Sequence, residues 1–372
     1  MKIEIQQEDL QKILSVVSGI VPSKTTMPIL SCILMDTENN RLKLSATNLD
    51  ISVSTEIEQV EIKQEGRVAV PANKFVTFTR SLSPGKVTIE EKKGKIIVIS
   101  GKATLEEPSM NAEEFPALPT FAEKTGLEVS AASIAEMVKE TSYSVSRDET
   151  RPALMGILWE VRGDGLSMVA TDAHRLARSR RKIKWDGPED RDIIVDTQGL
   201  HQFVRLAEGQ ESVSLHIGEN QLSFQIGATE LHTRLLEGPF PDYEAVIPKN
   251  NDKYIIVDRD IFSQAIRRVS ISADRITSQI RLGIESGRME LSAVSADGSR
   301  AEDEIPVSFE GEALEIGFNY TYLQDILKNV LSDTIQMSVR DSQSATLIEP
   351  ANNDSDDGDL LCLLMPLRLT AD

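Results

Sequence analysis

Residues 42–48 read LKLSATN, residues 166–172 read LSMVATD, and residues 289–295 read MELSAVS. In each stretch apolar and polar side chains largely alternate, which is typical of a β-strand with one buried face. The three stretches begin 124 and then 123 residues apart in a chain of 372 residues. A repeat of this length has the size of a whole domain. We therefore predict three copies of one domain, at residues 1–125, 126–250 and 251–372.

An amphipathic helix pattern recurs at the same interval. Apolar residues with helical spacing form one stripe in each copy: Leu10, Ile13, Leu14 and Val17; Ile134, Met137 and Val138; Phe262, Ala265, Ile266 and Val269. A second such pattern follows near Phe75, Leu200 and Leu323. Ser133 and Asp260 are the expected N-caps. The predicted fold class is α+β, with two helices packed on antiparallel sheet in each of three tandem domains.

The composition restricts the classes of protein. With 59 acidic and 40 basic residues the net charge is −19, which argues against a basic coat for nucleic acid or membrane. Aromatic residues, at 5%, are scarce for stacking on single-stranded nucleic acid. The longest apolar run, residues 360–367, is too short to span a bilayer. The two cysteines lie in apolar stretches, so we expect a cytoplasmic protein that makes no membrane contact.

The sequence contains no motif of a known catalytic chemistry. Phosphate-loop, nucleophile-elbow and zinc-protease patterns do not occur. Asp172 and His174 could share one face of a strand as two metal ligands, so a metal-dependent hydrolase is one alternative. A triplicated scaffold that never touches DNA is another. Because spacing suggests no third ligand, we expect a protein without catalytic residues, metal or cofactor.

Several motifs, taken in chain order, carry a family resemblance. They are MPIL at residues 27–30, VPANKF at 70–75, VATDAHRLA at 169–177, FPDY at 240–243, EIGFN at 315–319 and MPLRL at 365–369. Together with the three-fold repeat, they resemble the bacterial DNA polymerase III beta subunit family, the replicative sliding clamps. The resemblance runs from the first residue to Leu369.

The resemblance implies a head-to-tail dimeric ring that encircles duplex DNA without reading its sequence. Two helices in each of six domains give twelve helices, which at about 10 Å spacing make a circumference of about 120 Å around the hole. Such a ring is the non-catalytic processivity subunit of the DNA polymerase III holoenzyme, associated with the nucleoid. Its implied partners are the replicative polymerase alpha subunit, the clamp loader delta subunit, translesion and repair polymerases, and mismatch-repair proteins.

The resemblance also implies a cleft that binds short partner peptides between the second and third domains. Apolar residues with a few polar ones suit such a groove. The matching positions are Leu154, Thr171, Ala173, His174, Arg175, Leu176, Pro241, Val246, Ile247, Leu363, Leu364, Met365, Pro366, Leu367, Arg368 and Leu369. His174, Arg175 and Arg368 are expected to position the polar groups of the peptide. The chain departs from the family at Ala245, where arginine is common, and at residues 370–372, which extend past the usual end.

Two further sets of residues are implied. The expected DNA contacts are Lys12, Lys24, Lys139, Arg147, Arg151, Arg205, Arg267 and Lys328, of which Lys24, Arg147 and Arg151 carry over from the family. The expected dimer interface joins Lys74, Lys95, Lys102 and Leu105 of one chain to Ile271, Glu302, Asp303 and Glu304 of the other. Surface ion pairs contribute little each, so these pairs should orient the two chains more than hold them together.

Overall fold

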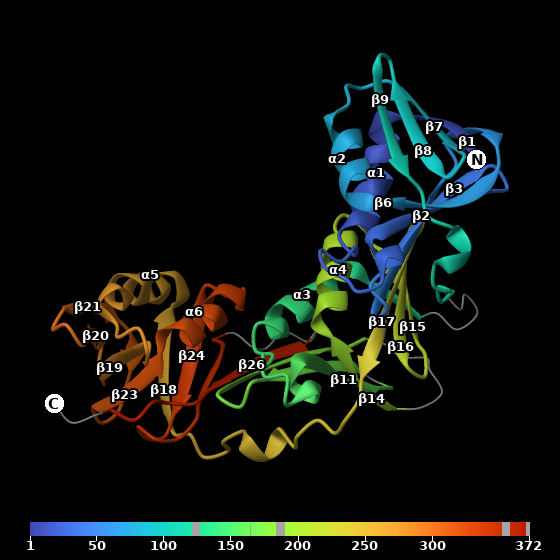
Figure 1. Ribbon diagram of the computed structural model, residues 1–372. Helices are drawn as coiled ribbons and strands as arrows, with labels where there is room; N and C mark the ends of the chain where they lie inside the picture. Colours follow the sequence, from blue (N-terminus) through green and yellow to red (C-terminus); the bar gives the residue numbers. More distant parts are fainter. Residues whose placement is uncertain (121–126, 164, 184–189, 352–357, 370–372) are drawn as a thin grey trace. The chain divides into compact units, whose positions relative to one another are not determined.

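The computed structural model describes residues 1–120, 127–163, 165–183, 190–351 and 358–369 (Figure 1). The expected boundary between residues 125 and 126, and the extension at residues 370–372, lie outside the described residues. Internal contacts group the chain into two compact units. The first holds residues 1–135 and 198–235, and the second holds residues 136–197 and 236–372.

The first unit contains two antiparallel sheets and the helices α1 (Gln7–Ser18), α2 (Ala72–Ser81) and α4 (Thr197–Leu206). One sheet has five strands in the order β5 (Val60–Gln64), β1 (Lys2–Gln6), β7 (Lys86–Lys92), β8 (Lys95–Ser100) and β9 (Ala103–Pro108). The other runs β6 (Gly66–Pro71), β2 (Cys32–Glu38), β3 (Arg41–Thr47), β4 (Ile51–Ile57), β17 (Thr229–Leu236), β16 (Gln221–Ile226), β15 (Ser212–Ile217) and β10 (Leu127–Ser130).

The second unit is also built from two antiparallel sheets, with α5 (Arg259–Val269), α6 (Tyr320–Asn329) and most of α3 (Ala131–Ser142). Its longer sheet runs β14 (Arg191–Asp196), β11 (Gly156–Arg162), β12 (Gly165–Thr171), β13 (Arg175–Arg181), β26 (Gly358–Leu364), β25 (Thr346–Pro350), β24 (Thr334–Val339), β18 (Lys253–Asp258) and β22 (Ser308–Phe309). The shorter sheet has the order β21 (Arg300–Pro306), β20 (Arg288–Val294), β19 (Gln279–Glu285) and β23 (Leu314–Asn319).

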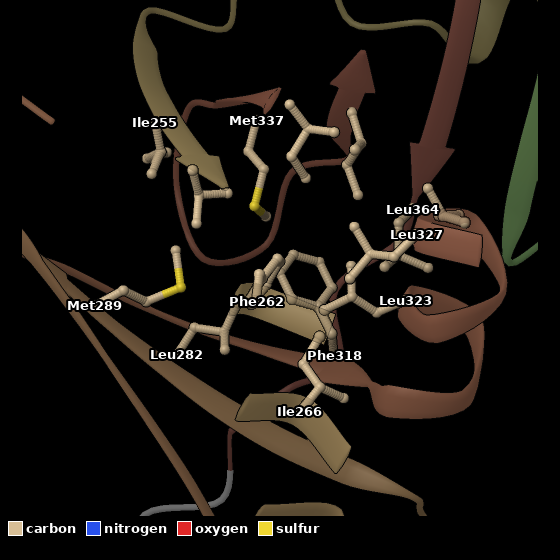
Figure 2. Close-up of a cluster of buried hydrophobic side chains, with 14 of the residues drawn as sticks. Ile255, Phe262, Ile266, Leu282, Met289, Phe318, Leu323, Leu327, Met337 and Leu364 are labelled. Atoms are coloured by element: carbon tan, nitrogen blue, oxygen red, sulfur yellow. The ribbon is translucent and has the colours of Figure 1, made fainter. Parts of the chain in front are cut away.

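The helices confirm the amphipathic pattern. In α1 the stripe residues Leu10, Ile13, Leu14 and Val17 are all buried, and α1 packs beside α2 (Figure 1). In α5 the stripe residues Phe262, Ala265, Ile266 and Val269 are buried in a core that also contains Phe318 and Leu323 (Figure 2). Fully burying a side chain such as phenylalanine or leucine stabilises the fold by about 1.5–3 kcal/mol. Apolar burial therefore explains why the same helix pattern recurs.

The predicted helix starts were wrong by two or three residues. The N-cap of α3 is Ser130 and not Ser133: the Ser130 hydroxyl accepts a hydrogen bond from the Ser133 backbone amide (3.2 Å). The carboxylate of Asp258, and not of Asp260, caps α5 by accepting the Ile261 amide (2.8 Å). In both cases a strand leads directly into the helix, so the cap is the last strand residue, which the apolar stripe alone does not reveal.

The described part of the second unit also has three shorter elements. They are the 3-10 helices η4 (Pro152–Met155), η5 (Glu244–Val246) and η6 (Ser270–Ser272). The first unit has η1 (Pro28–Ser31) and η2 (Ala112–Glu114). Among the described residues, none of the helices has the length and apolar character needed to cross a membrane.

Candidate functional site

The second unit contains an apolar cavity of about 750 Å³. It lies over a cluster of buried side chains from β11, β12, β13, β14 and β26, which include Leu158, Leu176 and Leu363. Four segments line it: residues 151–154, residues 171–176, residues 237–246 and the end of β26. Aliphatic, proline and aromatic side chains dominate the lining, so the cavity suits an apolar peptide or ligand.

Nine of the sixteen residues expected in the cleft line this cavity. They are Leu154, Thr171, Ala173, Arg175, Leu176, Pro241, Val246, Leu363 and Met365. The cavity also has wall residues that were not predicted for it: Arg151, Pro152, Ala153, Glu237, Gly238, Pro239, Phe240, Asp242 and Tyr243. Of the FPDY motif at residues 240–243, the sequence predicted only Pro241 for the cleft. The adjacent Gly238-Pro239 pair, which also lines the cavity, is the signal that could have extended the wall to this segment.

Seven expected cleft residues lie elsewhere. Leu364 is fully buried in the core of Figure 2, because successive residues of a strand point to opposite faces and Leu363 faces the cavity. Ile247 packs against the buried cluster beneath the cavity. His174 is exposed, with its ring 6.3 Å from that of Tyr322. The remaining four form the tail after the cavity: Pro366, Leu367, Arg368 and Leu369.

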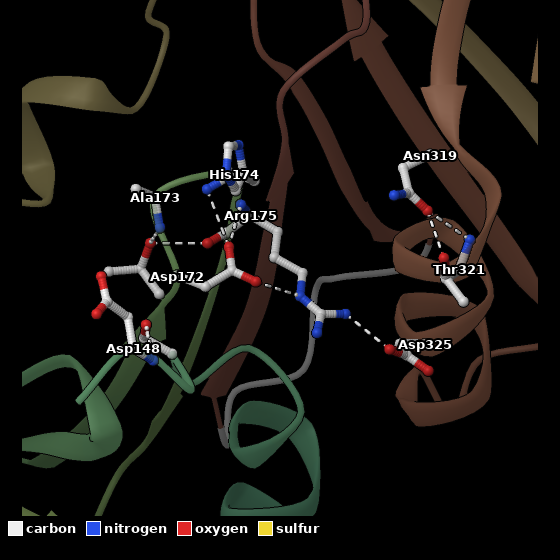
Figure 3. Close-up of polar contacts among 10 residues, drawn as sticks. Asp148, Asp172, Ala173, His174, Arg175, Asn319, Thr321 and Asp325 are labelled. Carbon is white, nitrogen blue, oxygen red and sulfur yellow. Dashed lines mark hydrogen bonds and ion pairs between the residues drawn. The ribbon is translucent and has the colours of Figure 1, made fainter. Parts of the chain in front are cut away.

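The turn between β12 and β13 forms one side of the cavity. Asp172 accepts the backbone amides of His174 (2.9 Å) and Arg175 (3.0 Å) through Oδ1. The Thr171 hydroxyl donates to the Arg175 carbonyl (2.7 Å) and accepts the Ala173 amide (3.2 Å), and Ala173 takes a positive φ of 76°. These bonds, drawn in Figure 3, hold the turn in one conformation. Both Asp172 and His174 therefore serve the turn, and in the described part of the chain no three His, Cys, Asp or Glu residues form a metal-binding group.

Arg175 connects this turn to α6. Its Nε donates to Asp172 Oδ2 (3.1 Å), and its Nη1 donates to Asp325 Oδ2 (2.8 Å), as Figure 3 shows. The guanidinium also lies 4.4 Å from the ring centre of Tyr322 and 5.4 Å from that of Tyr143, within the range of cation–π attraction. Only 8% of Arg175 is exposed. The side chain thus lines the cavity and at the same time holds the β12–β13 turn against α6, and its contact with the polar groups of a peptide stays a prediction.

Tyr243 fixes the opposite wall. Its hydroxyl donates to Glu160 Oε2 on β11 (2.7 Å), which ties the segment of residues 237–243 to the sheet. Burial, together with this bond to Glu160, raises the pKa of the Tyr243 phenol to about 12. The neutral phenol is therefore the form that the folded protein favours.

Tyr243→Phe is expected to lower the free energy of unfolding by about 1–2 kcal/mol near neutral pH, because the bond to a carboxylate is lost. The raised pKa means that this stabilisation is present below the phenol's unfolded pKa of about 10 and is lost as pH rises toward 12. Urea unfolding of both proteins across this range measures the difference, which should shrink with rising pH. A difference that stays constant from pH 10 to 12 would contradict the assignment.

The expected DNA contacts lie on helices and in loops. Lys12, Lys139, Arg267 and Lys328 are exposed positions on α1, α3, α5 and α6, Lys24 follows α1, and Arg147 and Arg151 precede η4. Arg151 pairs with Asp148 (2.9 Å) and borders the apolar cavity. Arg205 is used inside the first unit: Nη1 and Nη2 donate to the carbonyls of Ser15 and Val16 at the end of α1, each at 3.0 Å. Burial lowers the pKa of Arg205, and its geometry is that of a helix C-cap.

The residues expected at a dimer interface lie on or near two edge strands, except that Lys74 is on α2 and Lys95 on the interior strand β8. Leu105 is on β9, the edge strand of the five-stranded sheet, and Lys102 precedes it. Glu302, Asp303 and Glu304 are on β21, the edge strand of the four-stranded sheet, and Ile271 is 85% exposed. Most of the charged members already have partners in the same chain: Lys74 with Glu107, Lys95 with Glu106, Arg300 with Glu302, Arg268 with Asp303 and Arg288 with Glu304. A second chain must therefore compete with these pairs for the lysines and acids.

A three-fold repeated α+β chain with an apolar, peptide-sized groove and open sheet edges has the features of a non-catalytic clamp. Comparison with known families agrees: the DNA polymerase III beta subunit models match in order, the N-terminal domain over residues 1–119, the central domain over 128–242 and the C-terminal domain over 244–367. The chain belongs to the DNA polymerase III beta subunit family, whose members are DNA sliding clamps and not enzymes.

Relatives match along their whole length. The Beta sliding clamp of Pseudomonas putida is 30% identical over 99% of this chain and 100% of the relative. That of Escherichia coli strain K12 is 29% identical with the same coverage. Among solved structures, the Pseudomonas aeruginosa DnaN sliding clamp bound to griselimycin has a TM-score of 0.93 at 29% identity, covering 99% of this chain and 100% of that one. The Bacillus subtilis clamp has the same TM-score and identity and covers 100% of both chains. The three tandem clamp domains are thus confirmed.

Proposed function

We propose that two copies of this sliding clamp close head to tail into a ring around duplex DNA, where they tether the replicative polymerase and make synthesis processive. The observation that carries the proposal is the ordered match to all three beta subunit domains across residues 1–367. DNA and DNA polymerase are the partners that the family implies. A closed ring needs no high affinity for DNA, because its topology prevents dissociation, so a chain with a net charge of −19 can still stay on the duplex.

The domain boundaries are part of the proposal. We place them at residues 1–125, 126–250 and 251–372. The family models leave residues 120–127 unmatched, and the first boundary falls in this gap, where a connector between domains is expected. The C-terminal model begins at residue 244, seven residues before the proposed start of the third domain.

The partner site is proposed to be the apolar cavity of the second unit. Its aliphatic and aromatic lining and its two braced walls suit a short apolar peptide that brings its own polar flanks. The peptides would come from the replicative polymerase alpha subunit, the clamp loader delta subunit, translesion and repair polymerases, and mismatch-repair proteins. We include the tail after β26 in the site, because Met365 borders the cavity.

Closure of the ring is proposed to use the sheet edges β9 and β21. An edge strand has unpaired backbone groups that a strand of another chain can bind. Ile271, largely exposed on η6, supplies apolar contact near β21. Lys74, Lys95 and Lys102 would meet Glu302, Asp303 and Glu304 of the second chain. The DNA contacts are proposed to be Lys12, Lys24, Lys139, Arg147, Arg151, Arg205, Arg267 and Lys328, acting on phosphates in a nucleoid-associated, cytoplasmic protein.

The ring predicts a topological result. The chain is loaded onto nicked circular DNA by an ATP-driven clamp loader, and the circle is then cut at one site. We expect the protein to leave the DNA after cutting, because a ring slides off a free end. Gel filtration measures how much protein still elutes with the DNA. Blocking both ends with bound streptavidin should restore retention. If the chain stays on open linear DNA as well as on the circle, it is held by affinity and does not encircle the duplex.

The two alternatives fail on specific findings. The hydrolase needed Asp172 and His174 as free ligands, yet both oxygens of Asp172 hold the β12–β13 turn and Arg175. A scaffold that never touches DNA is overturned by membership of a family of DNA sliding clamps.

A further inference from the structure

The chain after β26 is fastened at two points. The Met365 amide donates to the His174 carbonyl (2.9 Å), and the Leu367 amide donates to the Gly317 carbonyl (2.8 Å). Leu367 and Gly317 form an antiparallel bridge, so the tail adds to the free edge of β23. The Gln279 side chain donates to the Arg368 carbonyl from the neighbouring strand β19 (3.3 Å). The two fastenings lie on either side of Pro366, whose ring fixes φ.

Gly317 is closely surrounded by this tail. A Cβ atom at Gly317 would lie 2.7 Å from a methyl carbon of Leu369, 2.8 Å from Gln279 Nε2 and 3.0 Å from the Leu367 carbonyl oxygen. The backbone of Gly317 does not have a positive φ, so its conformation would accept any residue. The need for glycine therefore comes from the tail and from the Gln279 side chain that holds it.

The cavity depends on where the tail is held. Met365 is 41% exposed and borders the cavity, and its own amide makes the first fastening, two residues before the fastening of Leu367 to Gly317. An unfastened Met365 would have to be ordered by each incoming peptide, which costs binding free energy that a fixed wall does not.

We propose that Gly317 and Gln279, which lie outside the cavity, are positioning residues that seat the tail on β23 and so fix Met365 as a wall for partner peptides. This inference rests on the proposed peptide-binding function of the cavity. It makes β23 of the third domain part of the partner site without any contact between β23 and the peptide.

The variant Gly317→Val tests this against a matched control, Gly283→Val. Gly283 lies on β19 of the same sheet, where a Cβ would find its nearest atom at 3.9 Å, an ordinary contact. The probe is a labelled peptide copied from the clamp-binding segment of the polymerase alpha subunit, followed by fluorescence anisotropy. We expect Gly317→Val to raise Kd about tenfold, as for loss of one good interface side chain, and Gly283→Val to change it less than about twofold.

A second pair of variants separates positioning from general damage. Deleting residues 367–372 removes the fastened part of the tail, which should by itself weaken peptide binding. Adding Gly317→Val to this deletion should then raise Kd no further. If Gly317→Val instead damages the sheet, its effect on Kd should add in full to that of the deletion. Gln279→Ala removes the donor without adding atoms, and it should weaken binding about two- to threefold. Unchanged affinity in Gly317→Val, or additive losses in the double variant, would overturn the proposal.

Hydrogen exchange distinguishes failure of the seating from failure of the proposed function. The Leu367 amide should exchange faster in Gly317→Val than in Gly283→Val, and this readout needs no peptide. If the Leu367 amide exchanges faster in Gly317→Val but the unaltered chain binds no peptide, the proposed peptide-binding function is wrong and the seating of the tail on β23 stands. If exchange does not respond, the seating itself is wrong.

Discussion

Arg175→Ala is expected to lower the free energy of unfolding by about 2–3 kcal/mol, the largest stability loss that we predict for one residue. The guanidinium neutralises Asp172 and Asp325 at 3.1 and 2.8 Å and lies against two tyrosine rings. Removing it leaves two carboxylates side by side in a partly buried place, so the loss exceeds that of an exposed ion pair. Urea unfolding followed by circular dichroism measures the change.

The matched control is Arg340→Ala, whose partner Asp341 lies at 3.0 Å but with both side chains about half exposed. That change should cost at most about 1 kcal/mol. The loss of unfolding free energy for Arg175→Lys should lie between those of these two variants. The lysine ammonium keeps the charge, but it lacks the planar guanidinium that bonds both carboxylates at once. Equal losses for Arg175→Ala and Arg340→Ala would show that the connection between the turn and α6 is not a structural support.

Deleting residues 365–372 is expected to weaken binding of the polymerase peptide at least about 100-fold, because the deletion removes both a cavity side chain and the fastened backbone. The sheet should survive, since β26 ends at Leu364 and pairs with β13 and β25 within residues 358–364. Fluorescence anisotropy measures peptide binding, and light scattering measures the mass, which should remain that of a dimer.

Deleting only residues 370–372 is the control for that experiment. It leaves every described contact of the tail in place, so affinity should stay within about twofold of the intact chain. Loss of the dimer on deleting residues 365–372 would mean that the tail is structural. Unchanged peptide affinity would remove Met365 and the tail from the site.

The sequence was informative wherever the signal was local or repeated. The three alternating stretches beginning at residues 42, 166 and 289 became β3, β12 and β20, and the apolar stripes became buried helix faces. Helix and strand periodicity is written in neighbouring residues, so it can be recognised without a structure. The family resemblance added nine cavity residues that no periodicity could have found.

Other features depend on residues far apart in the chain. Leu363 and Leu364 look alike in sequence, yet one faces the cavity and the other the core, because strand register decides which face each takes. The wall at residues 237–243 exists because Tyr243 reaches Glu160, 83 positions away. The lysines and acids assigned to the dimer interface have partners within the chain that only folding brings near.

The sequence by itself thus determined a triplicated α+β clamp and predicted an apolar cleft for partner peptides, because repeat length, periodicity and motifs are properties of the chain. Only the tertiary structure decided that Arg175 joins the β12–β13 turn to α6, that Arg205 caps α1, and that the tail and Gln279 leave little room for a Cβ atom at Gly317. The physical reason is common to all three. A side chain's role is set by the atoms that folding places within a few ångströms of it, and here those atoms include ones from residues 150, 190 and 50 positions away.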